Sequence, residues 1–434
     1  MSQFDDAIKK MRNIISRSVA RTNTDLALAL IVLATLVHRA QHNYPKWNHR
    51  TDVLHSAHEL EIMLGWENKA FSEHLLGDLQ WLDETSVSEL LSSLPGENTE
   101  EELEAWLLRQ LDSLEIPLSH ETPEEVARLM VMLTRHDHCF NIFDPACGSG
   151  SLLVAASKTT IGPTCLEGYE ANEYAAAWAQ VRFALNETPN VRLHINKRSN
   201  NRGGKRRLVD EVHKFDTVLT NPPFGIQFEL QDLQWLEGTP ALLKHDRGKI
   251  SSELAYLLSA YHHLKDQGMA AVLVPVGVLF RGGNDANIRQ FLIKERALAA
   301  VIALPARLSA PNTAIETAIL VLRRGTSGHD GDNVLMIDAR ELGKRIAQRV
   351  VLDTIELDKI IHIFQGLSSE KGFSKLTHAD EIKKQEFSLL PQRYVEYDSV
   401  VKTDRVKRRF RIEELTTSIR TLIDTYESLR NKLD

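Results

Sequence analysis

The amino-acid sequence predicts an α/β protein whose central part is a mostly parallel, doubly wound sheet. Three observations support this fold class. Helical patterns fill residues 1–115, strand and helix patterns alternate through residues 116–395, and residues 396–434 contain an a/d heptad pattern. Alternating strands and helices are typical of a parallel sheet covered on both faces. We therefore expect a helical N-terminal domain, a sheet domain and a C-terminal coiled-coil-like helical tail with these boundaries.

Length and composition are those of an ordinary globular protein. The chain has 434 residues and a formal net charge of -7, so bulk charge does not indicate nucleic-acid binding. Its three cysteines lack metal-ligand spacing, and we expect them to be reduced. No apolar run reaches the roughly 20 residues of a membrane helix, and the N-terminus lacks a secretion signal. We expect a cytoplasmic protein without membrane contact.

The first 115 residues carry helical signals. Thr22 to Asp25 can cap a helix that contains the apolar run from Leu26 to Val37. Further helical stretches are His55–Leu64 and Phe71–Leu82. After a break at residues 95–99, an acidic helix is expected over Glu100–Leu114.

The sheet domain opens with a helix start signal. Thr122 is a suitable cap, Pro123 suits the first helical position, and two glutamates follow in the first turn. Helices are also expected at Glu173–Leu185 and Ser252–Lys265. The expected strands are Asn141–Ala146, Cys165–Tyr169, Val191–Ile195, Thr217–Thr220, Ala270–Pro275, Leu298–Leu304 and Ala318–Leu322.

Two further segments each allow two interpretations. Lys197–Lys214 is rich in lysine and arginine around Gly203-Gly204, and it is either a solvated loop or a phosphate-contacting loop. Apolar residues between Ile412 and Leu433 are spaced alternately by three and four positions. This helix either packs on its own domain or joins a helix bundle with another chain, and its terminal, narrow stripe favours the second interpretation.

A glycine turn and an acidic residue indicate a nucleotide-like ligand. Gly148 and Gly150 follow the first strand, where glycine allows a tight turn and close backbone approach to a ligand. Leu153 stands where a dinucleotide site needs a small residue, which argues against NAD and FAD. Glu170 lies 20 residues after Gly150, at the end of the second strand, where a carboxylate can accept the hydroxyl protons of a ribose.

The stretch from Asn221 to Phe224 reads Asn-Pro-Pro-Phe after another strand. The consecutive prolines fix the backbone. The Asn221 side-chain oxygen and the Pro222 carbonyl can then accept hydrogen bonds from one planar amino group, which exposes the nitrogen lone pair. Pro223 completes the rigid turn, and Phe224 offers a face on which a base can stack.

In their order along the chain, these motifs resemble those of amino-group DNA methyltransferases that act on adenine. The matching pieces are Thr122-Pro123, Asp144 to Gly150, Glu170 and Asn221 to Phe224. More narrowly, the sequence resembles the modification subunit of type I restriction-modification systems, through similar segments in residues 252–324 and 387–394. The resemblance implies a Rossmann-like methyltransferase domain.

The resemblance also implies S-adenosylmethionine as the methyl donor, without a metal. It implies that Asn221, Pro222, Pro223 and Phe224 are catalytic. The residues that it implies for cofactor binding are Glu121, Thr122, Pro123, Asp144, Ala146, Gly148, Ser149, Gly150, Ser151 and Glu170.

The resemblance implies partners as well, because no stretch remains for a target-recognition domain. A separate specificity subunit would read double-stranded DNA and contact the helix at residues 412–433, usually with two copies of the modification subunit. Whether a restriction nuclease subunit joins the complex stays open.

Three features depart from the family pattern. Glu121 replaces an aromatic residue before Thr-Pro, Ser151 replaces a frequent glycine, and no carboxylate follows the third strand before Asp210. Two alternatives therefore stay open. One is a methyltransferase-fold scaffold of a defence complex with weak or no activity, and the other is a methyltransferase that acts on RNA or on a protein glutamine.

Overall fold

The computed structural model describes most of the chain. The described residues are 3–18, 25–41, 45–66, 69–94, 103, 106–107, 109–110, 121–135, 141–159, 165–195, 213–229, 249–308, 315–325 and 329–397. Within them, no helix is long and apolar enough to cross a membrane. The caps expected at Thr22–Thr24, most of the helix expected at Glu100–Leu114, most of the basic segment Lys197–Lys214 and the heptad helix 412–433 lie outside this set.

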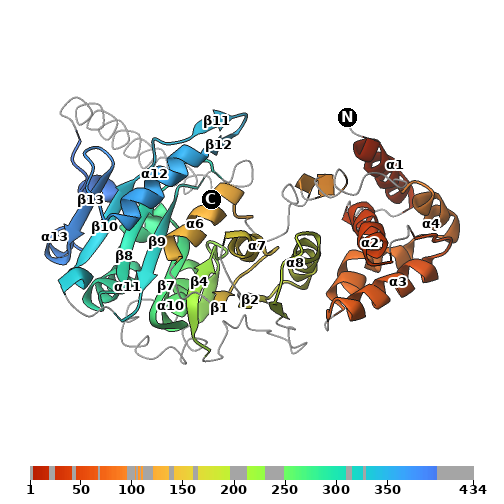
Figure 1. Ribbon diagram of the computed structural model, residues 1–434, viewed down its shortest axis with the longest axis horizontal. Coiled ribbons are helices and arrows are strands. Elements are labelled where there is room, and N and C mark those ends of the chain that lie inside the picture. The colour runs from red at the N-terminus through yellow and green to blue at the C-terminus, as the bar shows by residue number, and fades with distance from the viewer. Residues whose placement is uncertain are drawn as a thin grey trace, which may run out of the picture.

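A central sheet of nine strands runs through the described part of the chain, in the order β13-β10-β8-β9-β7-β4-β1-β2-β3 (Figure 1). β9 pairs antiparallel with β7 and β8, β13 pairs antiparallel with β10, and the other neighbours are parallel. The strands are β1 (Asn141–Asp144), β2 (Cys165–Glu170), β3 (Val191–Ile195), β4 (Phe215–Thr220), β7 (Leu264–Pro275), β8 (Leu298–Ala303), β9 (Thr317–Arg323), β10 (Asn333–Asp338) and β13 (Ser374–His378).

Helices cover both faces of this sheet, as the sequence predicts. Successive residues of β4 point to opposite sides, because Val218 packs in one hydrophobic core and Leu219 in the other. The first core contains residues of α10, α11 and α13, and the second contains residues of α6, α7 and α12. These helices are α6 (Glu124–Thr134), α7 (Ser151–Thr159), α10 (Ser252–His262), α11 (Asn284–Lys294), α12 (Thr354–Gln365) and α13 (Ala379–Lys384).

The N-terminal helices form a third hydrophobic core with α8 (Glu173–Leu185). Trp178 of α8 is fully buried among them, whereas Phe183 of the same helix packs in a core of the sheet. Arg39 Nη1 donates a 2.9 Å hydrogen bond to the Ala184 carbonyl of α8. The N-terminal helices with described bounds are α1 (Gln3–Ser18), α2 (Asp25–Gln41), α3 (Arg50–Met63), the π-helix η1 (Phe71–Leu75), the 3-10 helix η2 (Gly77–Trp81) and α4 (Glu84–Leu91). α8 therefore belongs to two cores at once.

Short elements complete the chain. β5 (Gln227–Glu229) pairs with β6 (Lys249–Ser251), and β11 (Lys344–Ile346) pairs with β12 (Arg349–Val351). The remaining short helices are the 3-10 turns η4 (Val276–Leu279), η5 (His329–Asp332) and η6 (Pro391–Arg393).

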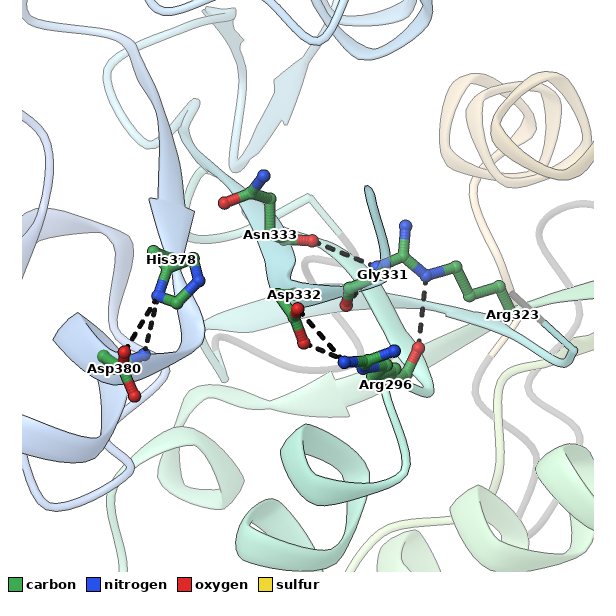
Figure 2. Close-up of polar contacts among 7 residues, drawn as sticks. All are labelled: Arg296, Arg323, Gly331, Asp332, Asn333, His378 and Asp380. Carbon is green, nitrogen blue, oxygen red and sulfur yellow. Dashed lines mark hydrogen bonds and ion pairs between the residues drawn. The ribbon is translucent and has the colours of Figure 1, made fainter. Parts of the chain in front are cut away.

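Polar side chains join the ends of β8, β9 and β10 at the amino-terminal edge of the sheet (Figure 2). Arg323 donates to the main-chain carbonyls of Arg296, Gly331 and Asn333 at 3.2, 2.9 and 3.1 Å. Arg296 also forms a 2.8 Å ion pair with Asp332. The Arg323 guanidinium thus provides hydrogen bonds for three main-chain carbonyls located at strand ends.

The structure corrects two expected helices. Phe71–Leu82 is not one regular helix, because it divides into η1 and η2 at Gly77. The wider π turn lets the adjacent residues Leu75 and Leu76 both point inward, and each is at most 1% exposed. The helix expected at Ser252–Lys265 ends at His262, because Leu264 already pairs with Phe215 as the start of β7.

Candidate functional site

The predicted site residues gather where the strand order reverses. β1 lies between β2 and β4, and all three are parallel, so their carboxyl ends share one edge of the sheet. Asp144 ends β1, Glu170 ends β2 and Asn221 follows β4. In an open α/β sheet, ligands bind at such a reversal, beyond the carboxyl ends of the strands.

The glycine turn between β1 and α7 has the backbone that the sequence predicts. Gly148 and Gly150 have φ angles of +55° and +83°, a region that L side chains rarely adopt. A Cβ atom on Gly150 would lie 2.5 Å from the ring of Phe183. Gly150 therefore has to be glycine both for its backbone conformation and for the close approach of α8. Ser151 begins α7 directly after this turn.

Glu170 contacts the glycine turn directly. Its Oε2 accepts a 2.8 Å hydrogen bond from the Gly148 amide, and its Oε1 accepts a 2.7 Å bond from the Asn172 amide. The two amides bind different oxygens of the carboxylate. They hold the carboxylate at the end of β2, beside the turn.

Asp144 is buried beneath the same turn, with 1% of its surface exposed. Its Oδ1 accepts a 3.0 Å hydrogen bond from the Ala146 amide. Burial raises the pKa of Asp144 to about 8, and the nearby Glu170 carboxylate adds to the rise, whereas hydrogen bonds from Ala146 and Thr220 oppose it.

Thr122 does not cap α6, which corrects the expected role of that residue in the helix start. Pro123 occupies the cap position rather than the first helical position, with φ -55° and ψ 142°, and no side chain caps the helix. Thr122 Oγ1 instead accepts a 3.0 Å hydrogen bond from Asn221 Nδ2. This bond fixes the Asn221 amide plane and turns its oxygen away from Thr122.

Glu121 joins three elements. Its Oε1 lies 3.0 Å from Arg182 Nη2 on α8, and its Oε2 accepts a hydrogen bond from the Ser149 hydroxyl in the glycine turn. The Arg182 and Glu121 side chains are 7% and 14% exposed. The residue that departs from the family pattern therefore has a buried, charged partner, which the sequence did not reveal.

A serine supports the loop that carries Asn221. Ser252, fully buried at the start of α10, donates its hydroxyl to the Pro223 carbonyl and accepts a 3.3 Å hydrogen bond from the Ile226 amide. Pro222 is buried, and Pro223 and Phe224 are half-buried. Ser252 therefore holds the loop in place through its hydroxyl, a role that the sequence did not suggest.

A small pocket that is partly open to solvent lies between these pieces. Eight of the predicted site residues line it together with Cys147 and Leu152, and they are Glu121, Thr122, Asp144, Ala146, Gly148, Ser149, Ser151 and Asn221. The others, which are Pro123, Gly150, Glu170, Pro222, Pro223 and Phe224, are not part of its lining. Two of the lining residues carry carboxyl groups and none carries a basic side chain, so the lining suits a ligand that donates hydrogen bonds.

Comparison with known sequences points to one family. The family model described as N-6 DNA Methylase matches residues 119–403. The methylase subunit of the type I restriction enzyme MpnII of Mycoplasma pneumoniae is 25% identical over 326 residues, which are 72% of this chain and 58% of that protein. The MjaIX methylase subunit of Methanocaldococcus jannaschii is 26% identical over 319 residues, 68% of this chain and 54% of that protein. The chain thus spans about half the length of these relatives.

Solved structures share the fold. A type I restriction-modification methyltransferase subunit from Streptococcus thermophilus superposes with a TM-score of 0.67 at 19% identity, covering 91% of this chain and all of that one. A type I modification subunit from Vibrio vulnificus gives a TM-score of 0.62 at 18% identity, covering 88% and 93%.

Proposed function

Because the chain belongs to the N-6 DNA methylase family, we propose that it transfers a methyl group from S-adenosylmethionine to the N6 amine of adenine in DNA. The observation that carries this proposal is the meeting of two motifs at one pocket. The glycine turn supplies one side of it, and Asn221 faces it from the neighbouring strand. A donor site and an acceptor site on adjacent strand ends are what a direct transfer between two bound molecules requires.

The residues present fit S-adenosylmethionine, which supplies an electrophilic methyl group when bound. Gly148 and Gly150, which lack Cβ atoms, stand on either side of Ser149 in the turn whose main chain is expected to contact the cofactor, and Ser151 follows them. Glu170, held beside the turn by two main-chain amides, would accept hydrogen bonds from the ribose hydroxyls. Glu121, Thr122 and Pro123 would hold the methionine end, and Asp144 and Ala146 would support the turn from β1.

Asn221 and Pro222 would orient the acceptor. The Asn221 oxygen and the Pro222 carbonyl accept hydrogen bonds from the adenine amine, while Phe224 stacks against the base. The hydrogen bond from Asn221 to Thr122 supports this role, because it holds the amide in one orientation before the base arrives. Pro223, held by Ser252, keeps the loop rigid. These residues act by positioning, which converts a reaction between separate molecules into one within a complex.

We also propose that the chain works as a modification subunit. The relatives are named as methylase subunits of type I restriction enzymes, and one structure of similar fold (TM-score 0.60) concerns complex assembly of a type I restriction-modification system. A specificity subunit would select the sequence in double-stranded DNA and bind the heptad helix at residues 412–433. Two copies per complex and a cytoplasmic location are part of the same proposal, and the presence of a nuclease subunit stays open.

A methylation assay tests the proposal. The full chain is co-expressed with the neighbouring reading frames, where a specificity subunit is expected, and incubated with labelled S-adenosylmethionine and genomic DNA lacking the modification. Nucleoside analysis should detect N6-methyladenine, and Asn221→Ala should abolish it without preventing cofactor binding. If RNA and protein are included as substrates and the labelled methyl group appears on RNA or on a protein glutamine but not on DNA, the chain belongs to the other methyltransferase class. Absence of saturable cofactor binding in the wild-type complex would favour the inactive scaffold.

A further inference from the structure

Arg182 is an unusual residue for its place in α8. Its neighbours along the helix, from Ala175 to Leu185, are mostly alanines and large apolar side chains, and they fill two hydrophobic cores. Arg182 itself is only 6% exposed. A buried ion pair seldom stabilises a fold better than apolar residues of the same size, so stability alone does not account for a charge here.

The charge of Arg182 is directed at the pocket through Glu121. Arg182 Nη2 contacts Glu121 Oε1 at 3.0 Å, while the Ser149 hydroxyl donates to Glu121 Oε2. The Ser149 bond uses one of the two acceptor directions of Oε2, whereas Oε1 is buried and accepts no hydrogen bond from the described residues despite its ion-pair contact with Arg182. Glu121 and Ser149 both line the pocket, whereas Arg182 does not. Arg182 and Ser149 therefore hold the Glu121 carboxylate in place. The remaining acceptor directions of the carboxylate are available to a ligand in the pocket.

The pocket lining offers hydrogen-bond acceptors and no basic side chain. The described lining residues include the carboxyl groups of Glu121 and Asp144 and no lysine or arginine, and the raised pKa of Asp144 keeps that group protonated near neutral pH. Glu121 is therefore the carboxylate that an ammonium group, which can donate three hydrogen bonds, would meet in the pocket. S-adenosylmethionine carries one ammonium group, on its methionine part.

We propose that Glu121, held in place by Arg182 and Ser149, binds the α-ammonium group of the cofactor's methionine part. The inference rests on the proposed function and adds a ligand group to a residue that departs from the family pattern. Arg182 acts here as a positioning residue. Its guanidinium stays cationic, and it fixes the carboxylate in a direction that an unpaired glutamate would not keep.

Titration calorimetry on the full chain with two ligands tests this assignment. S-adenosylhomocysteine contains the amino-acid part, and 5′-methylthioadenosine lacks it. Glu121→Gln should weaken S-adenosylhomocysteine binding about tenfold or more, the worth of a charge-assisted hydrogen bond, and leave 5′-methylthioadenosine binding unchanged. Glu125→Gln is the matched control. Glu125 also pairs with an arginine, Arg349, at 2.6 Å, but it does not line the pocket, so binding of both ligands should be unchanged.

Arg182 is tested by the same ligand pair. Arg182→Gln should reproduce the selective loss, and Arg182→Lys should restore part of it. If removing one charge prevents folding, the Glu121→Gln/Arg182→Gln double variant, which buries neither charge, takes its place and should show the same selectivity. Equal loss for both ligands in these variants, or no loss in Glu121→Gln, would overturn the inference alone. A wild-type chain that binds neither ligand would overturn the proposed function as well.

Discussion

The buried carboxyl group of Asp144 should make the stability of the protein fall as the pH rises. Burial raises its pKa from 3.8 to about 8 in the folded chain. The folded state therefore holds one proton more than the unfolded state between about pH 4 and pH 8, and the unfolding free energy declines through that window. Asp144→Asn keeps a polar side chain of the same shape that has no proton to lose, so the decline should disappear.

The size of the effect follows from the shift. Each pKa unit corresponds to about 1.4 kcal/mol. Between pH 5 and pH 8, the wild-type chain should lose on the order of 3 kcal/mol of unfolding free energy relative to Asp144→Asn. Urea unfolding of the cofactor-free chain at four pH values in this range measures the difference.

A control variant separates this effect from general titration. Asp266→Asn alters a carboxyl group whose side chain is 93% exposed, and its unfolding curve should follow that of the wild type at every pH. If Asp144→Asn also runs parallel to the wild type from pH 5 to pH 8, then Asp144 is ionised in the folded chain and the reasoning from burial is wrong.

Three further outcomes follow from single contacts. Gly150→Ala should lower the unfolding free energy by about 3 kcal/mol, because a positive φ angle and a steric clash combine there. Gly65 has φ +68° but no atom within 4 Å of an added Cβ, so Gly65→Ala should lower the unfolding free energy by only about 1 kcal/mol. Thr122→Val removes the acceptor of a 3.0 Å hydrogen bond and should lower the methylation rate at saturating cofactor about tenfold, whereas unchanged turnover would show that this bond does not position Asn221. Arg323→Ala should lower the unfolding free energy by about 2 kcal/mol in thermal unfolding, because three main-chain carbonyls lose their hydrogen-bond donor. Arg296→Ala breaks an ion pair whose arginine is 43% exposed and should lower it by less than about 1 kcal/mol. Equal losses in the two variants would contradict this ranking.

The sequence predicted most of the sheet because its central strands are short apolar runs bounded by turn residues. All seven expected strands are present, although β7 begins at Leu264, six residues before the expected start at Ala270, and Glu170 stands at the end of β2 as its spacing indicated. Two strands of the sheet were missed. Ser374–His378 (β13) is an edge strand with only one neighbour and several polar residues, and Asn333–Asp338 (β10) contains a short apolar run that periodicity alone does not assign to a strand.

The connections between distant residues could not be predicted. The Thr-Pro-Glu-Glu pattern is a valid local signal for a helix start, yet Thr122 bonds Asn221, which lies 99 residues away. The local signal gave the position of α6 correctly and the role of its threonine wrongly. The contact of Glu121 with Arg182 likewise depends on the packing of α8 against the turn after β1, which no local pattern encodes.

The shared helix α8 determines how the molecule can move. Trp178 and Phe183 pack on opposite sides of this helix, in the core of the N-terminal helices and in a core of the sheet. Exposing the tryptophan alone would cost about 3 kcal/mol, so the two parts cannot swing apart cheaply at this junction. A movement of α2 or η1, which both contact α8, would instead move α8 as a rigid body. Because Arg182 belongs to α8 and contacts Glu121, such a movement would displace the Glu121 carboxylate at the pocket.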